Sequence, residues 1–249
     1  MRLFQGKRGV LELRNFINTL RHGVLTEMIK KLLSSMFVWK LTGISYVTAV
    51  IATAGKYMPP SEYVVSGRTN VIDFAEDLRN KRVLELGCGL GRNLFALSNV
   101  IKEGVGIDIN RGYVRIATKL AKKYGFHNVS CISYDGQNLP ELGKFDAIME
   151  IGVFERLPKA YVKELLLKLR EAYANDGTRF ILYFLTSRAK GTEFTKRLGD
   201  EAYVYWDDGE VRDILSSLGI EIERVLQWKY ANVYIGSLRR KAPVQPEKS

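Results

Sequence analysis

Three closely spaced glycines form the part of the sequence whose pattern most clearly serves chemistry. Gly87, Gly89 and Gly91 follow a short apolar run at residues 82–86 and precede a helix-forming stretch. Glycines let the backbone turn tightly and let a ligand approach without a Cβ atom in the way. The helix that follows begins with unpaired N–H groups. The pattern therefore predicts a turn that binds a nucleotide-like ligand.

Two classes of nucleotide cofactor compete for this turn. The dinucleotide fingerprint has a third glycine or alanine where this chain has Arg92, and Gly91 comes one position early. Glu85 lies two residues before the first glycine. A carboxylate there would repel a pyrophosphate, but it suits the cationic amino end of a methionine moiety. The turn therefore favours S-adenosylmethionine over NAD.

Acidic residues also follow the next two apolar strands. Asp108 comes 21 residues after Gly87, and Ile109 follows it. An acidic residue at this distance can accept hydrogen bonds from both ribose hydroxyls. Asp135 and Gly136 follow the third strand, where a carboxylate beside a flexible glycine can contact an adenine amino group. Open α/β sheets bind ligands at the carboxyl ends of their strands, so these contacts are expected at one edge.

The elements that must position these residues alternate between helix and strand. Helices are expected over 71–78, 93–100, 113–124, 158–173 and 210–218. Strands are expected over 82–86, 104–109, 129–133, 145–151 and 180–185, and the segments 220–226 and 230–238 are expected to pair as a hairpin. Gly177 is expected to stop the helix over 158–173. This rhythm predicts an α/β fold with a parallel sheet and helices on both faces.

The chain is expected to have three parts. Residues 1–58 show helix-period apolar positions and form a helical extension or cap, which ends at two prolines. Residues 59–238 form the α/β domain, and residues 239–249 form a basic, disordered tail.

The charge of the chain is concentrated at its two ends. The net charge is +11, of which residues 1–58 contribute +7, residues 59–238 contribute +1 and residues 239–249 contribute +3. Basic ends suggest an acidic membrane surface or a nucleic acid as a partner, and the alternative is a basic surface that only favours solubility. The sequence does not predict an oligomeric state.

The sequence favours a cytoplasmic protein that is membrane-peripheral at most. The apolar stretch at 32–54 contains Lys40, so buried or interfacial helices are expected there rather than a spanning one. Met1 and the residues that follow lack the continuous apolar core of a signal peptide. Cys88 and Cys131 do not form a disulfide framework and are expected to be free thiols in a reducing compartment.

Four segments together resemble the motifs of class I S-adenosylmethionine-dependent methyltransferases. They are residues 83–93, 105–108, 135–140 and 145–157, similar to motifs I, II, III and IV of the family. The resemblance covers about residues 68–238. It implies a Rossmann-like, seven-stranded, doubly wound sheet with an antiparallel last strand.

The resemblance also implies which residues bind the cofactor. The segment from Glu85 to Gly91 would line the methionine end, Asp108 the ribose, and Asp135 the adenine. Residues 150–153 would form the floor beside the methyl group. The predicted cofactor-binding residues are Arg68, Glu85, Gly87, Cys88, Gly89, Gly91, Asn93, Asp108, Ile109, Asp135, Gly136, Glu150 and Ile151. Arg68 could clamp the cofactor carboxylate, or it could be an ordinary surface arginine.

The chain departs from the family in its acid–base residues. Many small-molecule members carry Glu-His where this chain has Glu155 followed by Arg156. His22 and His127 both lie in expected turns, so no imidazole base is predicted. Glu150 is the predicted catalytic residue, although Glu155 is a second candidate. No metal site is predicted.

Three functions fit these observations. The first is methyl transfer by in-line displacement to a small-molecule, sugar or lipid-like acceptor. The second keeps the chemistry but makes the acceptor RNA or protein, held by the basic ends. The third is a non-catalytic module that binds S-adenosylmethionine. Segment 186–208, which contains Tyr203, Tyr205 and Trp206, could be a substrate wall or a packed loop.

Overall fold

The structure of the protein is a computed structural model that describes residues 71–192, 194–195 and 200–239. The predicted helical extension, the apolar stretch at 32–54 and all but the first residue of the basic tail lie outside these residues. Arg68 and His22 also lie outside them. The predicted division into 1–58, 59–238 and 239–249 therefore stays a prediction.

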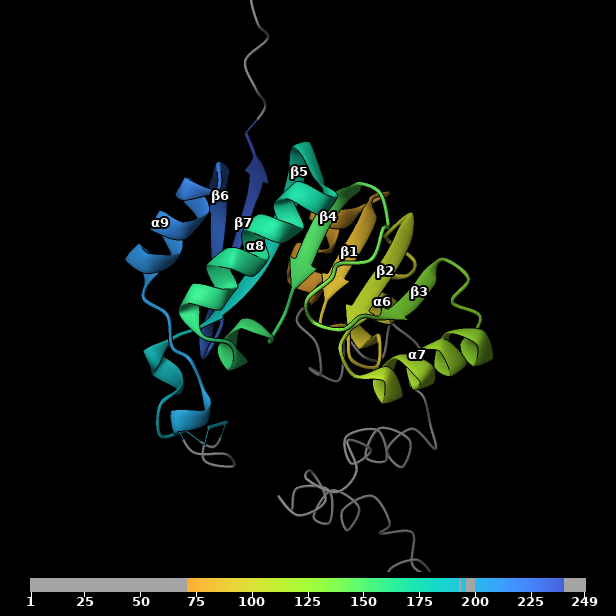
Figure 1. Ribbon diagram of the computed structural model, residues 1–249, viewed down its shortest axis with the longest axis horizontal. Helices are drawn as coiled ribbons and strands as arrows, with labels where there is room; N and C mark the ends of the chain where they lie inside the picture. Colours follow the sequence, from red (N-terminus) through yellow and green to blue (C-terminus); the bar gives the residue numbers. More distant parts are fainter. Residues whose placement is uncertain (1–70, 193, 196–199, 240–249) are drawn as a thin grey trace, which may run out of the picture. The chain divides into compact units, whose positions relative to one another are not determined.

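Seven strands form one mixed sheet in the order β3-β2-β1-β4-β5-β7-β6 (Figure 1). They are β1 (Arg82–Leu86), β2 (Glu103–Asp108), β3 (Val129–Ser133), β4 (Phe145–Glu150), β5 (Ala174–Leu185), β6 (Ile220–Gln227) and β7 (Ala231–Leu238). β1 to β5 run parallel to their neighbours in this group. β7 lies between β5 and β6 and runs antiparallel to both. The predicted Rossmann-like sheet with an antiparallel last strand is confirmed.

Helices pack on the sheet along its length. They are α6 (Arg92–Leu97), α7 (Arg111–Tyr124), α8 (Lys159–Tyr173) and α9 (Asp208–Ser217), with the 3-10 segments η2 (Val71–Leu78), η3 (Phe154–Arg156), η4 (Ser187–Ala189) and η5 (Asp200–Ala202). In Figure 1, α8 and α9 lie in front of the half of the sheet that contains β4 to β6. α7 packs against β2 and β3. Within the described ranges, no helix has the length and apolar character needed to cross a bilayer.

The predicted helix stop at Gly177 is wrong. α8 runs directly into β5 with no residue between them, so Gly177 lies inside the strand, where it has a φ of 83°. The register between β4 and β5 shifts just after Phe145. Thr178 Oγ1 donates to the Phe145 carbonyl at 2.9 Å and so satisfies a carbonyl at this irregular point. Gly177 therefore permits a bend inside β5. In the sequence, a glycine that bends a strand looks the same as a glycine that ends the preceding helix.

The apolar face of α8 was predicted from its spacing and is confirmed. The buried residues of this helix are Val162, Leu165, Leu166, Leu169 and Tyr173. They join the main core with aromatic residues of the sheet, including Phe184, whose ring lies 5.4 Å from that of Phe154. The core thus fixes β4 and β5 under α8, and β4 ends at the predicted site.

Two adjacent leucines of α8 provide a matched test of this packing. Leu166 is fully buried and Leu167 is 37% exposed. We expect Leu166→Ala to lower the free energy of unfolding by about 2–5 kcal/mol, because it leaves a cavity in the core. The same substitution at Leu167 should change it by no more than about 0.5 kcal/mol. Urea denaturation measures both values, and equal losses would contradict this assignment of the core.

Candidate cofactor-binding site

Four parallel strands end side by side at one edge of the sheet. The register places Leu86 of β1 between Ile107 of β2 and Glu150 of β4, and it pairs Asp108 with Ser133 of β3. The described segments that the sequence singled out follow directly after these strand ends. They therefore meet at the edge where open α/β sheets bind ligands.

The glycine turn after β1 depends on backbone conformations that favour glycine. Gly87, Gly89 and Gly91 have φ values of 70°, 54° and 76°. A Cβ atom on Gly87 would lie 2.1 Å from Val153 Cγ2, so this position has no room for a side chain. A Cβ atom on Gly89 would meet no heavy atom within 4 Å. The turn is thus closed toward Val153 and open at Gly89, where a ligand can approach the backbone.

Glu85 is a buried acid with unused hydrogen-bonding capacity. Its side chain is buried, and its Oε1 accepts a hydrogen bond from Asn93 Nδ2 at 2.7 Å. Its Oε2 has no hydrogen-bond partner among the described residues. Burial raises the pKa of Glu85 to about 7, the Asn93 bond opposes this rise, and the Asp108 carboxylate adds to it. An unpartnered buried carboxylate oxygen fits a cationic ligand group.

Asp108 joins the end of β2 to the glycine turn. Its Oδ2 accepts a hydrogen bond from the Gly89 backbone N–H at 2.8 Å, and its Oδ1 accepts one from Asn110 at 2.8 Å. The backbone N–H of Gly87 also donates to the Ile107 carbonyl at 2.7 Å. A carboxylate has about four lone-pair sites, so Asp108 can accept further hydrogen bonds from ribose hydroxyls.

Asp135 is exposed and is bound within its own turn. Its Oδ1 accepts hydrogen bonds from the backbone N–H groups of Gln137 at 2.8 Å and Asn138 at 2.7 Å. The bonds from Asn138, followed by the one from Gln137, lower the pKa of Asp135 to about 2. The carboxylate therefore stays ionised at neutral pH and keeps the turn in shape.

Gly136 and Ile109 lie against each other beside this turn. A Cβ atom on Gly136 would lie 3.5 Å from Ile109 Cγ2. Ile109 is 65% exposed, although it is a large apolar residue. The Gly136 carbonyl accepts a hydrogen bond from the Tyr161 hydroxyl of α8 at 2.8 Å. An exposed apolar side chain beside a fixed polar turn suits the flat face and polar edge of a purine.

Glu150 closes the loop that follows β4. It is fully buried, and its Oε1 accepts hydrogen bonds from the backbone N–H groups of Val153 and Phe154. Burial raises the pKa of Glu150 to about 8, although both bonds oppose the rise. Its Oε2 has no hydrogen-bond partner among the described residues. Glu150 thus fixes the loop after β4 through Val153 and Phe154, and its predicted catalytic role stays a prediction.

Glu155 is a second buried carboxyl near this loop. It forms a 3.7 Å ion pair with Arg156 and a hydrogen bond with Tyr183. Burial raises its pKa to about 7, while Arg156 and Tyr183 oppose the rise. A buried acid that changes charge near neutral pH is typical of functional sites, although structural networks produce the same shift.

Cys88 and Cys131 are both free thiols, as predicted. Cys88 is a buried residue of the glycine turn; its Sγ donates to the Gly89 carbonyl at 3.9 Å and lies close to Cys131 of β3. Gly106 of β2 makes room for this contact, because a Cβ atom there would lie 2.5 Å from Cys88 Sγ. The interaction with Cys131 and burial raise the pKa of Cys88, which makes it a poor nucleophile at neutral pH.

The segment that could be a substrate wall is a packed loop where the structure describes it. Trp206 is 4% exposed and its ring lies 5.1 Å from that of Phe184 in the core. Tyr203 is buried against Phe194, with 5.4 Å between their rings. His127 lies exposed in a turn, as predicted. Across the described ranges, no group of three or more His, Cys, Asp or Glu side chains is placed to hold a metal ion.

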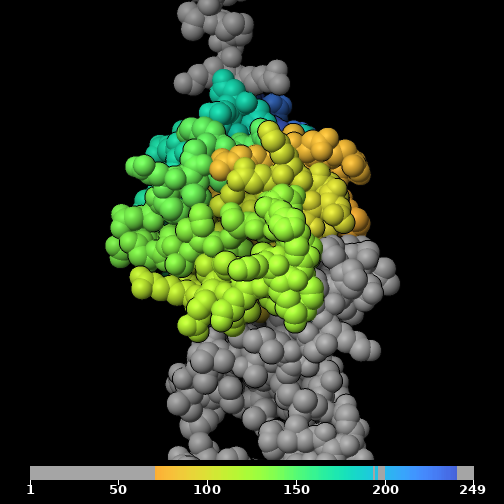
Figure 2. Space-filling model, turned by 90° about the vertical axis from the view of Figure 1, so that its right-hand side faces the viewer, coloured from red at the N-terminus to blue at the C-terminus, as the bar shows by residue number. Residues whose placement is uncertain are grey.

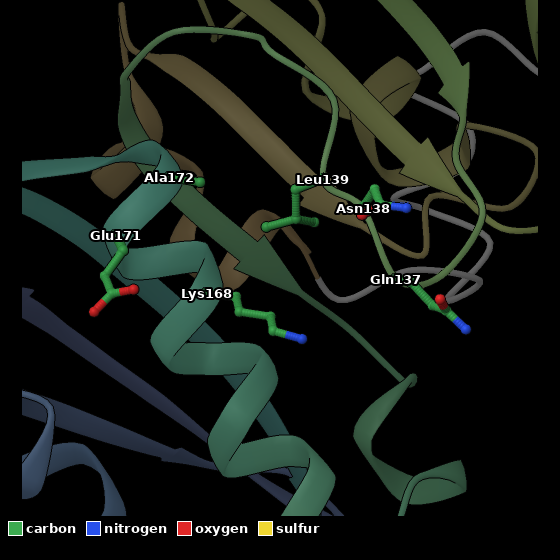
Figure 3. Close-up of a pocket in the computed structure, with 6 residues that line it drawn as sticks. All are labelled: Gln137, Asn138, Leu139, Lys168, Glu171 and Ala172. Atoms are coloured by element: carbon green, nitrogen blue, oxygen red, sulfur yellow. The ribbon is translucent and has the colours of Figure 1, made fainter.

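A pocket of about 450 Å³ adjoins the Asp135 turn (Figure 3). It is lined by Gln137, Asn138, Leu139, Lys168, Glu171 and Ala172. Figure 3 shows Leu139 pointing toward α8, and Lys168 forms a 2.7 Å ion pair with Glu164. Of the residues that surround the glycine turn, none lines this pocket.

The structure places the described residues of the predicted site at or next to adjacent strand ends, and it adds two contacts that the sequence analysis did not predict. Val153 packs against Gly87, and Tyr161 of α8 binds the Gly136 carbonyl. Neither contact has a signal in residue spacing, because each joins segments that are distant in sequence. Arg68 lies outside the described residues, so its predicted role is unaffected.

The sequence matches a known family in the region that builds this site. Residues 83–177 match the family described as a methyltransferase domain. A protein-L-isoaspartate O-methyltransferase from Nitrobacter winogradskyi is 33% identical over 104 residues, which are 41% of this chain and 46% of that protein. Aklanonic acid methyltransferase from a Streptomyces species is 37% identical over 70 residues, 27% of this chain and 32% of that protein. The chain thus spans less than half of these relatives.

The fold also matches solved structures. Magnesium protoporphyrin IX methyltransferase from Synechocystis, solved with bound SAH, superposes with a TM-score of 0.56 at 20% sequence identity. The match covers 73% of this chain and 84% of that one. A SAM-dependent methyltransferase from Aquifex aeolicus gives the same score and identity and is covered completely. Residues 83–177 therefore match a methyltransferase domain, and the sheet has the Rossmann-like fold of these solved methyltransferases, which the motifs predict.

Proposed function

We propose that this protein is an S-adenosylmethionine-dependent methyltransferase. The observation that carries the proposal is the buried Glu85 carboxylate, whose Oε2 has no partner among the described residues, directly before an open glycine turn. Asp108 at the next strand end and the Ile109–Gly136 surface beyond it add a polar contact and an apolar one. In this order, the groups match an ammonium, a ribose and a purine.

The residues of the chain fit the parts of this cofactor. Glu85 would hold the ammonium of the methionine end, because an ionised carboxylate at a buried position gains from a cationic partner. Asp108 would accept hydrogen bonds from the ribose hydroxyls. Ile109 and Gly136 would contact the adenine. The cofactor itself supplies a methyl group on a sulfonium that is already activated for displacement.

Positioning and exclusion of water are then the main tasks of the protein. An in-line displacement needs the acceptor held at the methyl group, and a general base only where the acceptor loses a proton. Glu150 is buried and accepts hydrogen bonds from the loop that follows it. This suits a residue that positions residues 151–153, the proposed floor beside the methyl group. The described residues offer no obvious general base such as a histidine near the carboxyl ends of the strands, and this accords with methyl transfer.

The acceptor remains part of the proposal. A small-molecule, sugar or lipid-like acceptor is our first candidate, since the relatives include a methyltransferase named for aklanonic acid. A protein or nucleic-acid acceptor is the second, since other relatives are named for protein isoaspartate. The two free thiols accord with a cytoplasmic protein.

Calorimetry with S-adenosylmethionine and NAD tests the proposed cofactor. We expect the unmodified protein to bind S-adenosylmethionine and not NAD. Asp108→Ala should weaken S-adenosylmethionine binding by about 10-fold to 100-fold, because it removes charged hydrogen bonds worth about 1.5–3 kcal/mol. Asp213→Ala, at an exposed residue of α9, is the matched control and should bind as the unmodified protein does. Binding of NAD alone would contradict the proposal.

The pH dependence of binding tests the role of Glu85. Its pKa is raised to about 7, so it is mostly protonated below that pH and cannot pair with an ammonium. We therefore expect S-adenosylmethionine affinity to rise between about pH 5 and about pH 7, by up to tenfold per pH unit at the acidic end. In Glu85→Gln this rise should be lost, and affinity should stay low at both pH values.

A second buried carboxyl provides the control for this profile. Glu155 has a pKa raised to about 7 for the same main reason, burial, but it hydrogen-bonds Tyr183 instead of residues of the glycine turn. Glu155→Gln should therefore keep the pH dependence of the unmodified protein. A profile that persists in Glu85→Gln, or disappears in Glu155→Gln, would contradict the assignment of the ammonium site to Glu85.

A further inference from the structure

The exposed face of α7 carries charge of one sign. Its 14 residues contain five cations and no acidic residue. The cations, which we call the α7 stripe, are all exposed: Arg111, Arg115, Lys119, Lys122 and Lys123. At about 100° per residue they fall within about 120° of the helix circumference and extend over about 18 Å. The stripe is therefore one continuous basic face that covers about a third of the helix circumference.

No acidic side chain in the described part of the protein forms an ion pair with the α7 stripe. The other long helices differ. On α8, Lys168 pairs with Glu164, and on α9, Arg212 pairs with Asp208. A row of unneutralised cations produces a local positive potential that attracts an anionic partner.

The opposite face of α7 is buried against the sheet. Val114, Ala117 and Ala121 are buried, and the helix packs on β2 and β3. Figure 2 shows the side of the molecule on which α7 (yellow-green) lies at the surface. A helix that binds in a membrane interface inserts its apolar face, and α7 has no such face to offer. The partner must therefore be held by charge and hydrogen bonds.

The net charges of residues 1–58 and 239–249 are +7 and +3, so composition does not suggest either segment as an anionic match for the α7 stripe. A basic face about 18 Å long on one helix fits an extended polyanion that runs along the helix. Arg111 and Arg115 present forked donors that suit phosphate oxygens.

We propose that the α7 stripe binds the phosphodiester backbone of a single-stranded nucleic acid. This binding goes beyond the proposed methyl transfer and does not depend on it. Each cation that neutralises a phosphate releases counterions, so the logarithm of the affinity falls with the logarithm of salt concentration by about 0.7 per contact on a single strand. Five contacts predict a contribution of about −3.5 to that slope.

Two double variants of the full chain test the proposal. Arg115→Gln with Lys119→Gln removes two cations of the stripe and keeps good helix formers. Lys163→Gln with Lys229→Gln removes two exposed cations elsewhere and is the control. Fluorescence anisotropy over a range of salt concentrations measures binding to a single-stranded RNA of about 16 nucleotides, and to DNA of the same length. Co-sedimentation with phosphatidylserine-containing vesicles measures membrane binding.

The stripe variant should have a salt slope less steep by about 1.4 and should bind about 25-fold more weakly near 0.1 M salt. The control should stay within about twofold of the unmodified protein. Equal behaviour of the two variants, no RNA or DNA binding by the unmodified protein, or stripe-dependent binding to vesicles alone would overturn the proposal. S-adenosylmethionine binding, measured on the same samples, reports separately on the proposed function and on folding.

Discussion

The hydrogen bond from the Gly89 backbone N–H to the Asp108 carboxylate joins the ends of β1 and β2 where the proposed site begins. It fixes the open part of the glycine turn against the end of β2, at 2.8 Å. The same carboxylate holds Asn110, which caps α7 by accepting hydrogen bonds from Gly112 and Tyr113. One acidic residue thus sets both the shape of the turn and the start of the next helix. A ligand bound there would meet backbone that is already in place.

Three buried glutamates at or after the ends of β1 and β4 are costly for the fold. Burial raises the pKa of Glu85 and Glu155 to about 7 and that of Glu150 to about 8. Glu85 and Glu150 each keep one oxygen without a partner among the described residues. A core built only for stability would place apolar side chains at such positions. At Glu85 the proposed cationic ligand would compensate the charge, whereas at Glu150 two backbone N–H groups already stabilise it.

The sequence predicted the elements whose signals are local. The bounds of β1 and β3 are as expected, because each is a short apolar run between clear breaks. The role of Gly177 was wrong, since a glycine after a helix has the same local appearance whether it ends the helix or bends the next strand. The engagement of Glu150 with its own loop, and the contact of Val153 with Gly87, depend on how segments meet in space. No spacing rule in one sequence reports such contacts.

The arrangement of charges on the surface also could not be predicted from the sequence alone. Residues 59–238 have a net charge of only +1, so composition suggests a balanced domain. The structure shows that the balance is uneven. Asp77 of η2 is paired with Arg179 and Arg224, whereas α7 contains five cations and no acidic residue. Cations and acids that cancel in a sum can lie on different surfaces, and the potential that a partner meets is set by the surface it approaches.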